Sequence, residues 1–434
     1  MLFPGARHCR FSHSLGTYYL GQKAFRHFFN NAGGCFEGVS KETWSAYERT
    51  FLIACLLHDC AHAPFSHTFE SYYDYVPTAE TSRLQAPLLA AAKDKAFERD
   101  YTAPAANNPS PHEKASAVLV LTHFRDAVRS LEGDPLLASR MILGCRHLGP
   151  DNDTMRLENC LISLLNGKAV DVDKLDYILR DTWASGVNNS SIDIHRLLSS
   201  LTYDAEQHRL AFHKSALAVL QSVVDGRNYL YRWIFGHHKV IYNQYLLTTA
   251  IKCLAERLSP DAPDRFFSNL FSLEAFAGDV DIGKGTSVYL PTDHDLTVLL
   301  RRYRDQIPEA REYLFRQHSR KALWKTSVEF SRLFPKKTSE ELVLIESIAK
   351  DVLSDKVDGR VAEIGFVVQK IPQKIVVIQT GEILIQIEGT SYSYDHLLGT
   401  PTFPDASKAF YVFAPLGCLD RSGEFIAALQ ALSI

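Results

Sequence analysis

The sequence lacks an excess of charge of either sign. It carries 47 Lys and Arg against 50 Asp and Glu in 434 residues, which gives a net charge of −3 at pH 7. Proteins that bind nucleic acid or an anionic membrane in bulk usually carry a broad positive field. The composition therefore argues against both kinds of partner, and an anionic ligand has to be held by a local site.

The sequence also lacks long hydrophobic runs and paired cysteines. No stretch of about 18 apolar residues occurs, and the segment MLFPGARHCRFS has no charged region followed by an apolar run. The cysteines occur without a CxxC pair, in a chain too long to need disulfides, at Cys9, Cys35, Cys55, Cys60, Cys145, Cys160, Cys253 and Cys418. We therefore expect reduced thiols, no membrane-spanning segment and a cytoplasmic location.

What is present is ordinary globular composition, 46% hydrophobic and 22% charged, enough for one large domain and a smaller one. Apolar residues recur at helical spacing through most of the first two thirds of the chain. The expected helices cover 43–59, 114–131, 159–167, 172–183 and 216–258. Between Glu70 and His112 (residues 71–111) lies a long insertion that ends in TAPAANNPSP, a composition that favours a surface loop over a lid.

Beyond residue 330 the composition changes to runs of β-branched residues, which predict strands. The runs cover 360–369, 374–389 and 408–415, with a hairpin turn expected at Thr380 and Gly381 and a closing helix over GEFIAALQAL. The sequence thus predicts a mainly α protein, with a helical core and its extension over residues 1–330 and a small α+β domain over 331–434.

The segment LLHDCAHAPFSHTFE, residues 56–70, supplies most of the candidate chemistry. Directly after the apolar run FLIACLL it contains His58, Asp59, His62, His67 and Glu70. One histidine on an apolar helix is usually a core residue, but burying this many ionisable groups is costly unless they are paired or bind a metal. His58 and Asp59 lie about 100° apart on a helix, so they can share one ion only near the end of a turn, and Pro64 provides such an end.

A second segment, AVDVDKLDYILRD at residues 169–181, offers further donors. It contains Asp171, Asp173, Asp176 and Asp181 together with Lys174, Tyr177 and Arg180. Lys174, Tyr177 and Asp181 have the spacing of one helix face. A solvated face with salt bridges explains the same spacing, so periodicity leaves both interpretations open. Imidazole and carboxylate together suit Mn, Fe, Mg, Zn or Ni, and one ion needs about four such ligands.

Several motifs, in this order, resemble one family. His13, the pair His58 and Asp59, and Asp173 reproduce the H…HD…D signature of the HD-domain phosphohydrolases. RFSHSLG, HDCAHAPFSHTFE, HE at 112–113, DVDKLDYILRD followed by SGV, and FGHHK near 235 resemble the deoxynucleoside triphosphate (dNTP) triphosphohydrolases. That group contains bacterial dGTPases and the eukaryotic SAM-and-HD-domain dNTP hydrolase. The likeness runs from residue 1 to about 330.

The resemblance implies an HD-domain helical core and a role for each matched residue. It implies one divalent metal ion, Mn, Mg, Fe, Ni or Zn, bound by His13, His58, Asp59 and Asp173. It places His62, His67 and His112 near the α-phosphate, with His112 as the general acid and Glu113 as its neighbour. It implies substrate contacts from Arg10, Lys174, Tyr177 and Asp181, and from Arg232, His238 and Lys239, with Arg227 competing for the role of Arg232.

By the same likeness, the protein hydrolyses dNTPs to a deoxynucleoside and inorganic triphosphate. It would act as a homo-oligomer, with room for a nucleotide activator. One alternative is an HD-domain phosphohydrolase for another nucleotide or phosphate ester, such as a monophosphate or a cyclic nucleotide. This is motivated by a family stretch before PGARHCRFSHS that contacts base and sugar and has no counterpart here. The other alternative, a catalytically silent nucleotide-binding scaffold, is disfavoured because all four metal positions and His112 are present.

Overall fold

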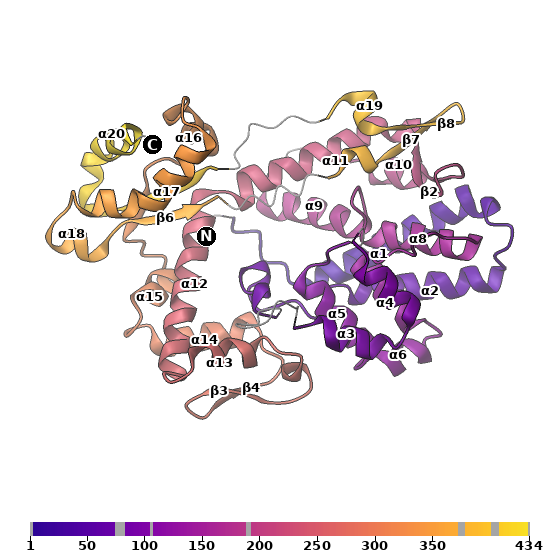
Figure 1. Ribbon diagram of the computed structural model, residues 1–434, viewed down its shortest axis with the longest axis horizontal. Coiled ribbons are helices and arrows are strands. Elements are labelled where there is room, and N and C mark those ends of the chain that lie inside the picture. The colour runs from indigo at the N-terminus through magenta and orange to yellow at the C-terminus, as the bar shows by residue number, and fades with distance from the viewer. Residues whose placement is uncertain are drawn as a thin grey trace. The chain divides into compact units, whose positions relative to one another are not determined.

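A computed structural model of the chain describes residues 3–73, 83–104, 107–187, 192–371, 378–400 and 408–432. Within these ranges the protein is mainly helical, with small sheets, which confirms the predicted class of a mainly α protein with a smaller α+β part (Figure 1). The chain forms two compact units. Unit 1 comprises residues 1–230, 267–292 and 377–401, and unit 2 comprises 231–266, 293–376 and 402–434.

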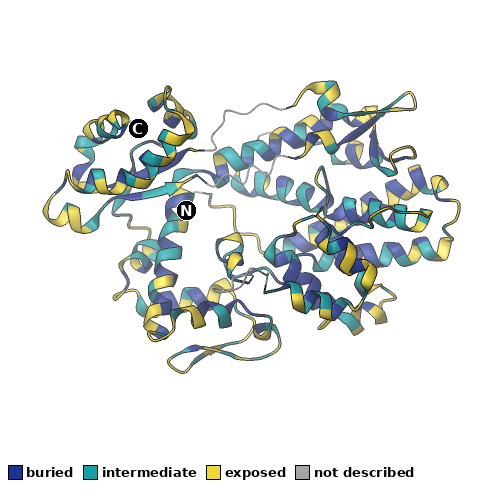
Figure 2. Ribbon diagram, viewed as in Figure 1, coloured by how far each residue is buried: buried dark blue, intermediate teal, exposed yellow. Residues whose placement is uncertain are grey.

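Unit 1 is built around helix α1, which packs against α2 and α9. Its main helices are α1 (Arg10–Ala32), α2 (Lys41–Leu57), α3 (Gln85–Ala92), α4 (Lys95–Thr102), α5 (Pro111–Leu121), α6 (Arg125–Ser130), α7 (Pro135–Leu143), α8 (Asp153–Leu165), α9 (Val172–Ser185), α10 (Ile194–Ser199) and α11 (Leu217–Tyr229). Short 3-10 turns are η1 (Gly33–Cys35), η2 (Ser66–Thr68), η3 (Glu70–Tyr73), η4 (Lys214–Ala216), η6 (Glu274–Phe276) and η7 (Thr380–Glu382). The helices bury their apolar faces against one another, as Figure 2 shows by the dark blue inner surfaces.

A four-stranded sheet completes unit 1 and joins two distant parts of the sequence. Its order is β1-β2-β7-β8, with β1 (Leu201–Asp204), β2 (Arg209–His213), β7 (Leu384–Ile387) and β8 (Thr390–Ser393). Strands β2 and β7 are parallel, with Phe212 opposite Ile385, and the other pairs are antiparallel. Helix α19 (Tyr394–Leu398) follows β8, and β3 (Val280–Gly283) pairs with β4 (Thr286–Val288) in a separate hairpin.

This sheet differs from the expected organisation in two respects. The hairpin turns at Glu388 and Gly389, where both residues have a positive φ, whereas Thr380 and Gly381 lie in η7. The β7–β8 hairpin also belongs to unit 1 because β7 pairs with β2, so the compact units do not follow a single boundary at residue 330. Residues 374–377 of the expected strand lie outside the described residues.

Unit 2 has its own sheet and core. Its elements are α12 (His238–Leu258), α14 (Asp293–Tyr303), α15 (Pro308–Phe315), β5 (Arg320–Ala322), α16 (Ser327–Leu333), α17 (Ser339–Ser354), α18 (Gly359–Ile364), β6 (Val367–Lys370), β9 (Phe410–Pro415), η8 (Leu416–Arg421) and α20 (Ser422–Ala431). The π-helical turn η5 (Leu230–Phe235) and α13 (Pro263–Leu270) each have residues in both units. Strand β9 pairs antiparallel with β5 and β6. Trp324 anchors this core by donating from its indole nitrogen to the Phe410 carbonyl at 2.7 Å.

Two expected elements are interrupted in this region. The expected helix 216–258 breaks at η5 into α11 and α12, and the expected strand 360–369 becomes α18 followed by β6. The strand over 408–415 and the closing helix are confirmed as β9 and α20. Apolar periodicity predicted the position of these segments better than their continuity.

The described part of the 71–111 insertion forms a packed pair of helices. Leu88 of α3 and Phe97 of α4 are fully buried against α5 and α7, and Asp94 caps α4 by accepting from the Phe97 amide at 2.6 Å. Residues 74–82 and 105–106 lie outside the described residues. The expected surface loop is thus replaced, over residues 85–102, by helices that contribute to the core of unit 1.

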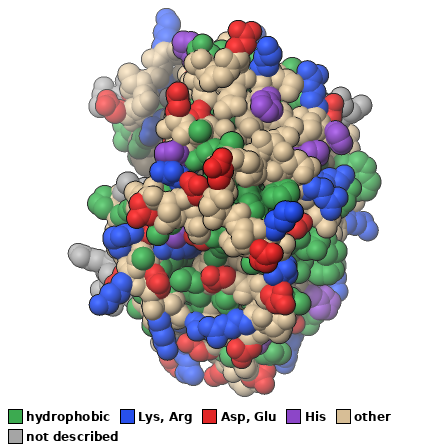
Figure 3. Space-filling view, turned by 90° about the vertical axis from the view of Figure 1, so that its right-hand side faces the viewer, with side chains coloured by type: hydrophobic (Ala, Val, Ile, Leu, Met, Phe, Trp, Pro, Cys, Tyr) green, Lys and Arg blue, Asp and Glu red, His purple; other side chains and the backbone are tan. Residues whose placement is uncertain are grey.

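The surface and the cysteines agree with the composition. On the face shown in Figure 3, basic and acidic side chains are intermixed without a broad area of one sign. All eight cysteines are free, and among the described residues no helix has both the length and the apolar character needed to cross a membrane.

Helices α1 and α9 are in close contact at Gly16. A Cβ atom at this position would overlap the Asp176 carboxylate and the Arg180 guanidinium. The absence of a side chain therefore lets Asp176 reach across to α1.

Replacing Gly16 by alanine tests this contact. Alanine in a helix interior usually stabilises by about 1 kcal/mol relative to glycine. Here we expect Gly16→Ala to lower the free energy of unfolding by about 1–3 kcal/mol, because the added methyl group overpacks the interface. Urea unfolding measures this, with Gly34→Ala as control, since a Cβ there meets nothing within 4 Å. A more stable Gly16→Ala protein would contradict the assignment.

Candidate metal centre and active site

The four predicted metal ligands converge in unit 1. His13 lies on α1, His58 and Asp59 lie where α2 ends, and Asp173 lies in the first turn of α9. Nε2 of His13 is 3.3 Å from Nε2 of His58 and 3.0 Å from Oδ1 of Asp173. The Asp59 carboxylate is 3.8 Å from the His13 nitrogen and 3.7 Å from the His58 nitrogen. Donors that share an ion at about 2.1 Å are separated by about 3.0–3.4 Å. His13, His58 and Asp173 approach this spacing and could hold one divalent cation, whereas the Asp59 oxygens lie farther away.

Partners on the far side of each imidazole orient both histidines. Nδ1 of His13 is 2.7 Å from Oδ2 of Asp176, and Nδ1 of His58 is 2.9 Å from the Cys55 carbonyl. With the Nδ1 hydrogens donated to these oxygens, both Nε2 lone pairs face the cluster. The chain therefore presents two oriented imidazoles and two carboxylates, a donor set that suits the metals expected from the sequence.

The charges of the cluster depend on one another. Burial opposes protonation of His13, but its hydrogen bonds to Asp173 and Asp176 raise its pKa to about 10. Burial also opposes ionisation of Asp173, yet His13 and His58 hold its pKa well below the usual range. The carboxylates thus remain ionised in the cluster. Their negative charge can be neutralised either by the protonated histidines or, when the histidines are neutral, by a divalent cation.

A second cluster adjoins the first and contains the predicted catalytic histidines. Glu70 bridges two of them, with Oε2 2.6 Å from Nδ1 of His112 and Oε1 3.0 Å from Nδ1 of His67. The rings of His62 and His112 stack with centroids 4.2 Å apart. Nε2 of His112 lies 3.5 Å from Oδ1 of Asp59, which joins the two clusters.

Two of these histidines have opposite proton affinities. Burial disfavours the charged form of His112, but the hydrogen bond to Glu70 outweighs burial and raises its pKa. Burial, together with the positive charges of His112 and Arg10, lowers the pKa of His62 to about 2. Neither ring nitrogen of His62 has a hydrogen-bond partner among the described residues. The Glu70 contact thus favours the protonated form of His112, whereas His62 stays neutral at neutral pH.

The predicted neighbour of His112, Glu113, is engaged in the helix cap of α5. Its carboxylate accepts from the Ser110 amide at 2.5 Å and from the Asn166 side chain at 2.8 Å. Ser110 completes the capping box, and Pro111 occupies the first helical position. Glu113 thus anchors the start of the helix that carries His112.

The predicted substrate residues of unit 1 lie around the metal cluster. Arg10 pairs with Asp59 and donates to the Ser66 hydroxyl at 3.3 Å. Lys174 pairs with Asp171 and donates to the Gly167 carbonyl at 2.8 Å.

The two remaining residues of unit 1 lie along α9. The Tyr177 hydroxyl accepts from Arg227 at 2.9 Å, and Asp181 lies 2.9 Å from His8. The face Lys174, Tyr177 and Asp181 is therefore engaged with other groups of unit 1 rather than forming only a solvated surface.

The remaining predicted substrate residues belong to unit 2. Arg232 lies over the Trp233 ring, and His238 is 3.2 Å from the Lys325 carbonyl. Lys239 lies in the first turn of α12, where its amide donates to the His237 ring at 3.1 Å. Arg227 and Arg232 were alternatives for the same predicted substrate contact. Of these two, Arg227 lies in unit 1, where it donates to the Tyr177 hydroxyl.

Sequence reasoning assigned no role to Asp176 and Glu70, which orient the histidines. Asp173, Asp176 and Arg180 are spaced i, i+3 and i+7, and Arg180 donates to Asp176 at 2.8 Å. Glu70 follows His67 by three residues, which is the spacing of one helical turn. Both spacings were visible in the sequence and indicate pairs on a common face.

Comparisons with known proteins agree with this geometry. A sequence profile of the HD domain matches residues 10–164. A Mycoplasma pneumoniae homologue of the uncharacterized protein MG461 is 26% identical over 261 residues, covering 59% of this chain and 51% of that protein. The Gallus gallus deoxynucleoside triphosphate triphosphohydrolase SAMHD1 is 26% identical over 259 residues, 58% of this chain and 38% of that protein. The chain thus spans about half the length, or less, of these curated relatives.

A solved structure shares the fold. A phosphohydrolase from Bacteroides thetaiotaomicron superposes with a TM-score of 0.58 at 18% identity, covering 95% of this chain and 89% of that one. The HD-domain match coincides with a cluster of donors that suits a divalent metal. Residues 10–164 thus match the HD-domain family, and the SAMHD1 relatives are named as deoxynucleoside triphosphate triphosphohydrolases.

The hydrogen bond between Asp176 and His13 leads to a metal-affinity prediction. Removing such an orienting partner typically lowers metal affinity 10- to 100-fold. We expect this loss for Asp176→Ala, measured by Mn²⁺ titration and by metal content after dialysis. Arg180→Ala is the matched control, because it removes the other partner of Asp176 and leaves the His13 contact in place. Equal affinity in Asp176→Ala and wild type would refute the orienting role.

Proposed function

We propose that the protein hydrolyses deoxynucleoside triphosphates to a deoxynucleoside and inorganic triphosphate, using the metal ligands His13, His58, Asp59 and Asp173. The observation that carries this proposal is the position of His112, whose Nε2 lies 3.5 Å from the predicted ligand Asp59. An imidazole with a raised pKa beside a predicted metal ligand is placed to act as a general acid in phosphoester hydrolysis. The SAMHD1 relatives support the choice of dNTPs as substrate.

The proposed chemistry assigns each group a separate task. When bound, a divalent metal supplies polarisation of a phosphoryl oxygen and acidifies a coordinated water. Arg10 exchanges its partner Asp59 for an oxygen of the α-phosphate, which places fixed positive charge at the reacting group. The oxygen of water then forms a bond to the α-phosphorus while that water releases a proton to solvent, and the bond from phosphorus to the 5′-oxygen breaks.

His112 donates the proton that the departing 5′-oxygen needs. Glu70 keeps the imidazole protonated and fixes its ring through the 2.6 Å contact to Nδ1, so Nε2 is the donating atom. His62, held neutral, and His67, on the other oxygen of Glu70, line the same side of the site. We assign to them contacts with the phosphate.

Residues of α9 and α11 are proposed to hold the sugar and the remaining phosphates. Tyr177 and Asp181 lie one and two turns after the ligand Asp173 and are assigned to the deoxyribose and its 3′-hydroxyl. Lys174 is assigned to a phosphate, with Arg227 as the basic residue from α11 that unit 1 brings to Tyr177. Arg232, His238 and Lys239 remain predicted contacts from unit 2.

The broader setting is proposed on resemblance. We infer a cytoplasmic homo-oligomer that has one metal ion per chain and responds to a nucleotide activator. Sedimentation equilibrium with and without dNTP measures the oligomeric state.

Product identification tests the reaction. Purified protein with Mn²⁺ or Mg²⁺ and each dNTP is expected to yield nucleoside and triphosphate in equal amounts. Asp59→Ala and Asp173→Ala should lose both activity and metal. His112→Ala should slow turnover by about 10²- to 10⁴-fold with metal retained. Release of monophosphate and pyrophosphate would refute the reaction, and metal loss in His112→Ala would refute the ligand set.

The Glu70 contact predicts the pH dependence. A general acid acts only when protonated, so turnover is expected to fall as pH rises through the raised pKa of His112. Glu70→Gln removes the carboxylate that raises this pKa, so the alkaline limb of kcat should move to lower pH. The control is Glu158→Gln, which removes a carboxylate 2.5 Å from His147, outside the site. An unshifted alkaline limb in Glu70→Gln would contradict the role of His112.

A further inference from the structure

A second cavity lies within unit 1, and none of the predicted metal or substrate residues lines it. Its volume is about 460 Å³, in the range of pockets that hold small organic ligands. Its walls come from the segment after α7, from α8, from the loop between α8 and α9, from the β1–β2 turn and from the start of β7.

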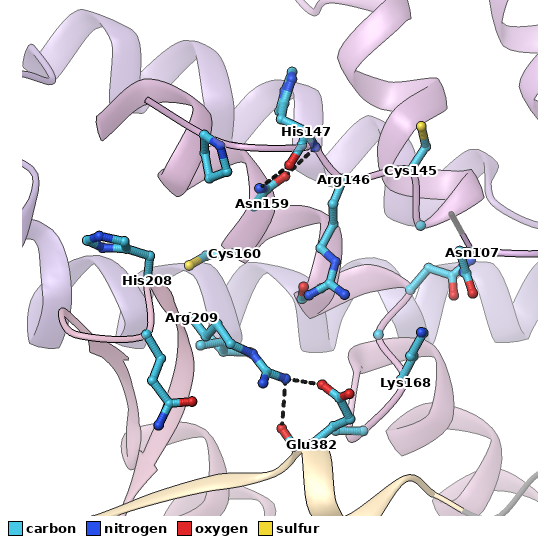
Figure 4. A pocket seen from close by; sticks show the side chains of 18 of the residues that line it. Asn107, Cys145, Arg146, His147, Asn159, Cys160, Lys168, His208, Arg209 and Glu382 are labelled. Atoms are coloured by element: carbon cyan, nitrogen blue, oxygen red, sulfur yellow. Dashed lines mark hydrogen bonds and ion pairs between the residues drawn. The ribbon is translucent and has the colours of Figure 1, made fainter. Parts of the chain in front are cut away.

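The charges that line this cavity are predominantly positive. Figure 4 shows Arg146 and Arg209 extending into the same space, with Lys168 on the neighbouring wall. Arg209 pairs with Glu382, but within the described ranges of the chain neither Arg146 nor Lys168 has an ion-pair or side-chain hydrogen-bond partner. Two cations therefore remain uncompensated in one concave site, which favours an anionic ligand.

The acidic groups at the edge of the cavity do not cancel this charge. Asp100 is buried and engaged by Arg140 at 3.0 Å and by Arg99 at 2.8 Å. Glu382 is occupied by Arg209, which also donates to its carbonyl at 3.3 Å. The cavity thus keeps a net positive lining.

Part of the lining is apolar and rigid. Cys145, Cys160, Phe212 and Leu384 line the cavity and are each less than one tenth exposed. Such a surface offers no partner to a bare inorganic anion but buries the face of a ring. We propose that this cavity binds a phosphorylated ring compound of nucleotide size, with the phosphate at Arg146 and Lys168 and the ring against the apolar wall.

The loop between α8 and α9 connects this cavity to the catalytic helices. Asn166 lines the cavity and donates to Glu113, which caps the helix that carries His112. The next residue, Gly167, donates to Asp171 at 2.9 Å and accepts from Lys174 at 2.8 Å. A ligand that orders this loop therefore acts on both α5 and α9, whichever phosphoester the metal site hydrolyses.

Calorimetric titration of the full chain tests the site directly. The probes are AMP, GMP, inorganic phosphate and guanosine, each titrated into wild type and into Asp173→Ala, whose metal site is disrupted. We expect at least one nucleotide to bind both proteins equally, and guanosine and inorganic phosphate to bind at least about tenfold more weakly. Binding that disappears in Asp173→Ala, or no nucleotide binding at millimolar concentration, would overturn the proposal.

Side-chain variants locate the binding. Arg146→Ala and Lys168→Ala should each weaken nucleotide binding about tenfold or more, because each removes a charged contact to phosphate. Lys168 is exposed, so its variant tests the site without disturbing the core. The matched control Arg129→Ala removes an exposed arginine of α6 and should bind like wild type. Unchanged affinity in both cavity variants would overturn the proposal.

Glu382 provides a test with the opposite sign. Glu382→Gln removes the anionic partner of Arg209, so nucleotide binding should become tighter by about twofold to tenfold. Weaker binding in Glu382→Gln would show that the Glu382 carboxylate contacts the ligand. This result would overturn the proposed orientation, in which the phosphate lies at Arg146 and Lys168.

Discussion

The hydrogen bond between His13 and Asp176 is the contact on which the geometry of the candidate metal centre depends. It crosses from α1 to α9 at the position where Gly16 has no side chain, so the helices are close enough for a 2.7 Å contact. The bond fixes the imidazole so that Nε2 faces His58 and Asp173. The close packing of α1 against α9 therefore also sets the orientation of the His13 imidazole.

The buried charges explain why the cluster is compact. Burial alone would neutralise the carboxylates and discharge the histidines, yet Asp173 and Asp59 are kept ionised by the cationic groups that face them. A cluster of this kind is costly without compensation, because each charge loses hydration. Metal binding and protonation of the histidines compensate the same carboxylates, so metal affinity is expected to fall as pH falls.

The convergence of the predicted ligands could be anticipated from the sequence because these residues stand in short, unusual motifs. His58 and Asp59 follow an apolar run that ends a helix, and the structure places both where α2 stops. The positions of Asp176 and Glu70 required knowledge of which faces meet, since each bonds to a histidine on another segment. That the β7–β8 hairpin belongs to unit 1 could not be predicted, because local β-propensity does not specify that β7 pairs with β2.

The loop after α8 shows how a cavity and a reaction site can share structure without sharing residues that contact the ligand. Asn166 and Gly167 bond to the groups that begin α5 and α9, and both helices carry site residues in their first turns. A displacement of this loop changes the anchoring of His112 through Glu113 and the position of Lys174 through the Gly167 carbonyl. Because these contacts are short and partly buried, we propose that the helix caps of α5 and α9 are the route by which the two sites are coupled.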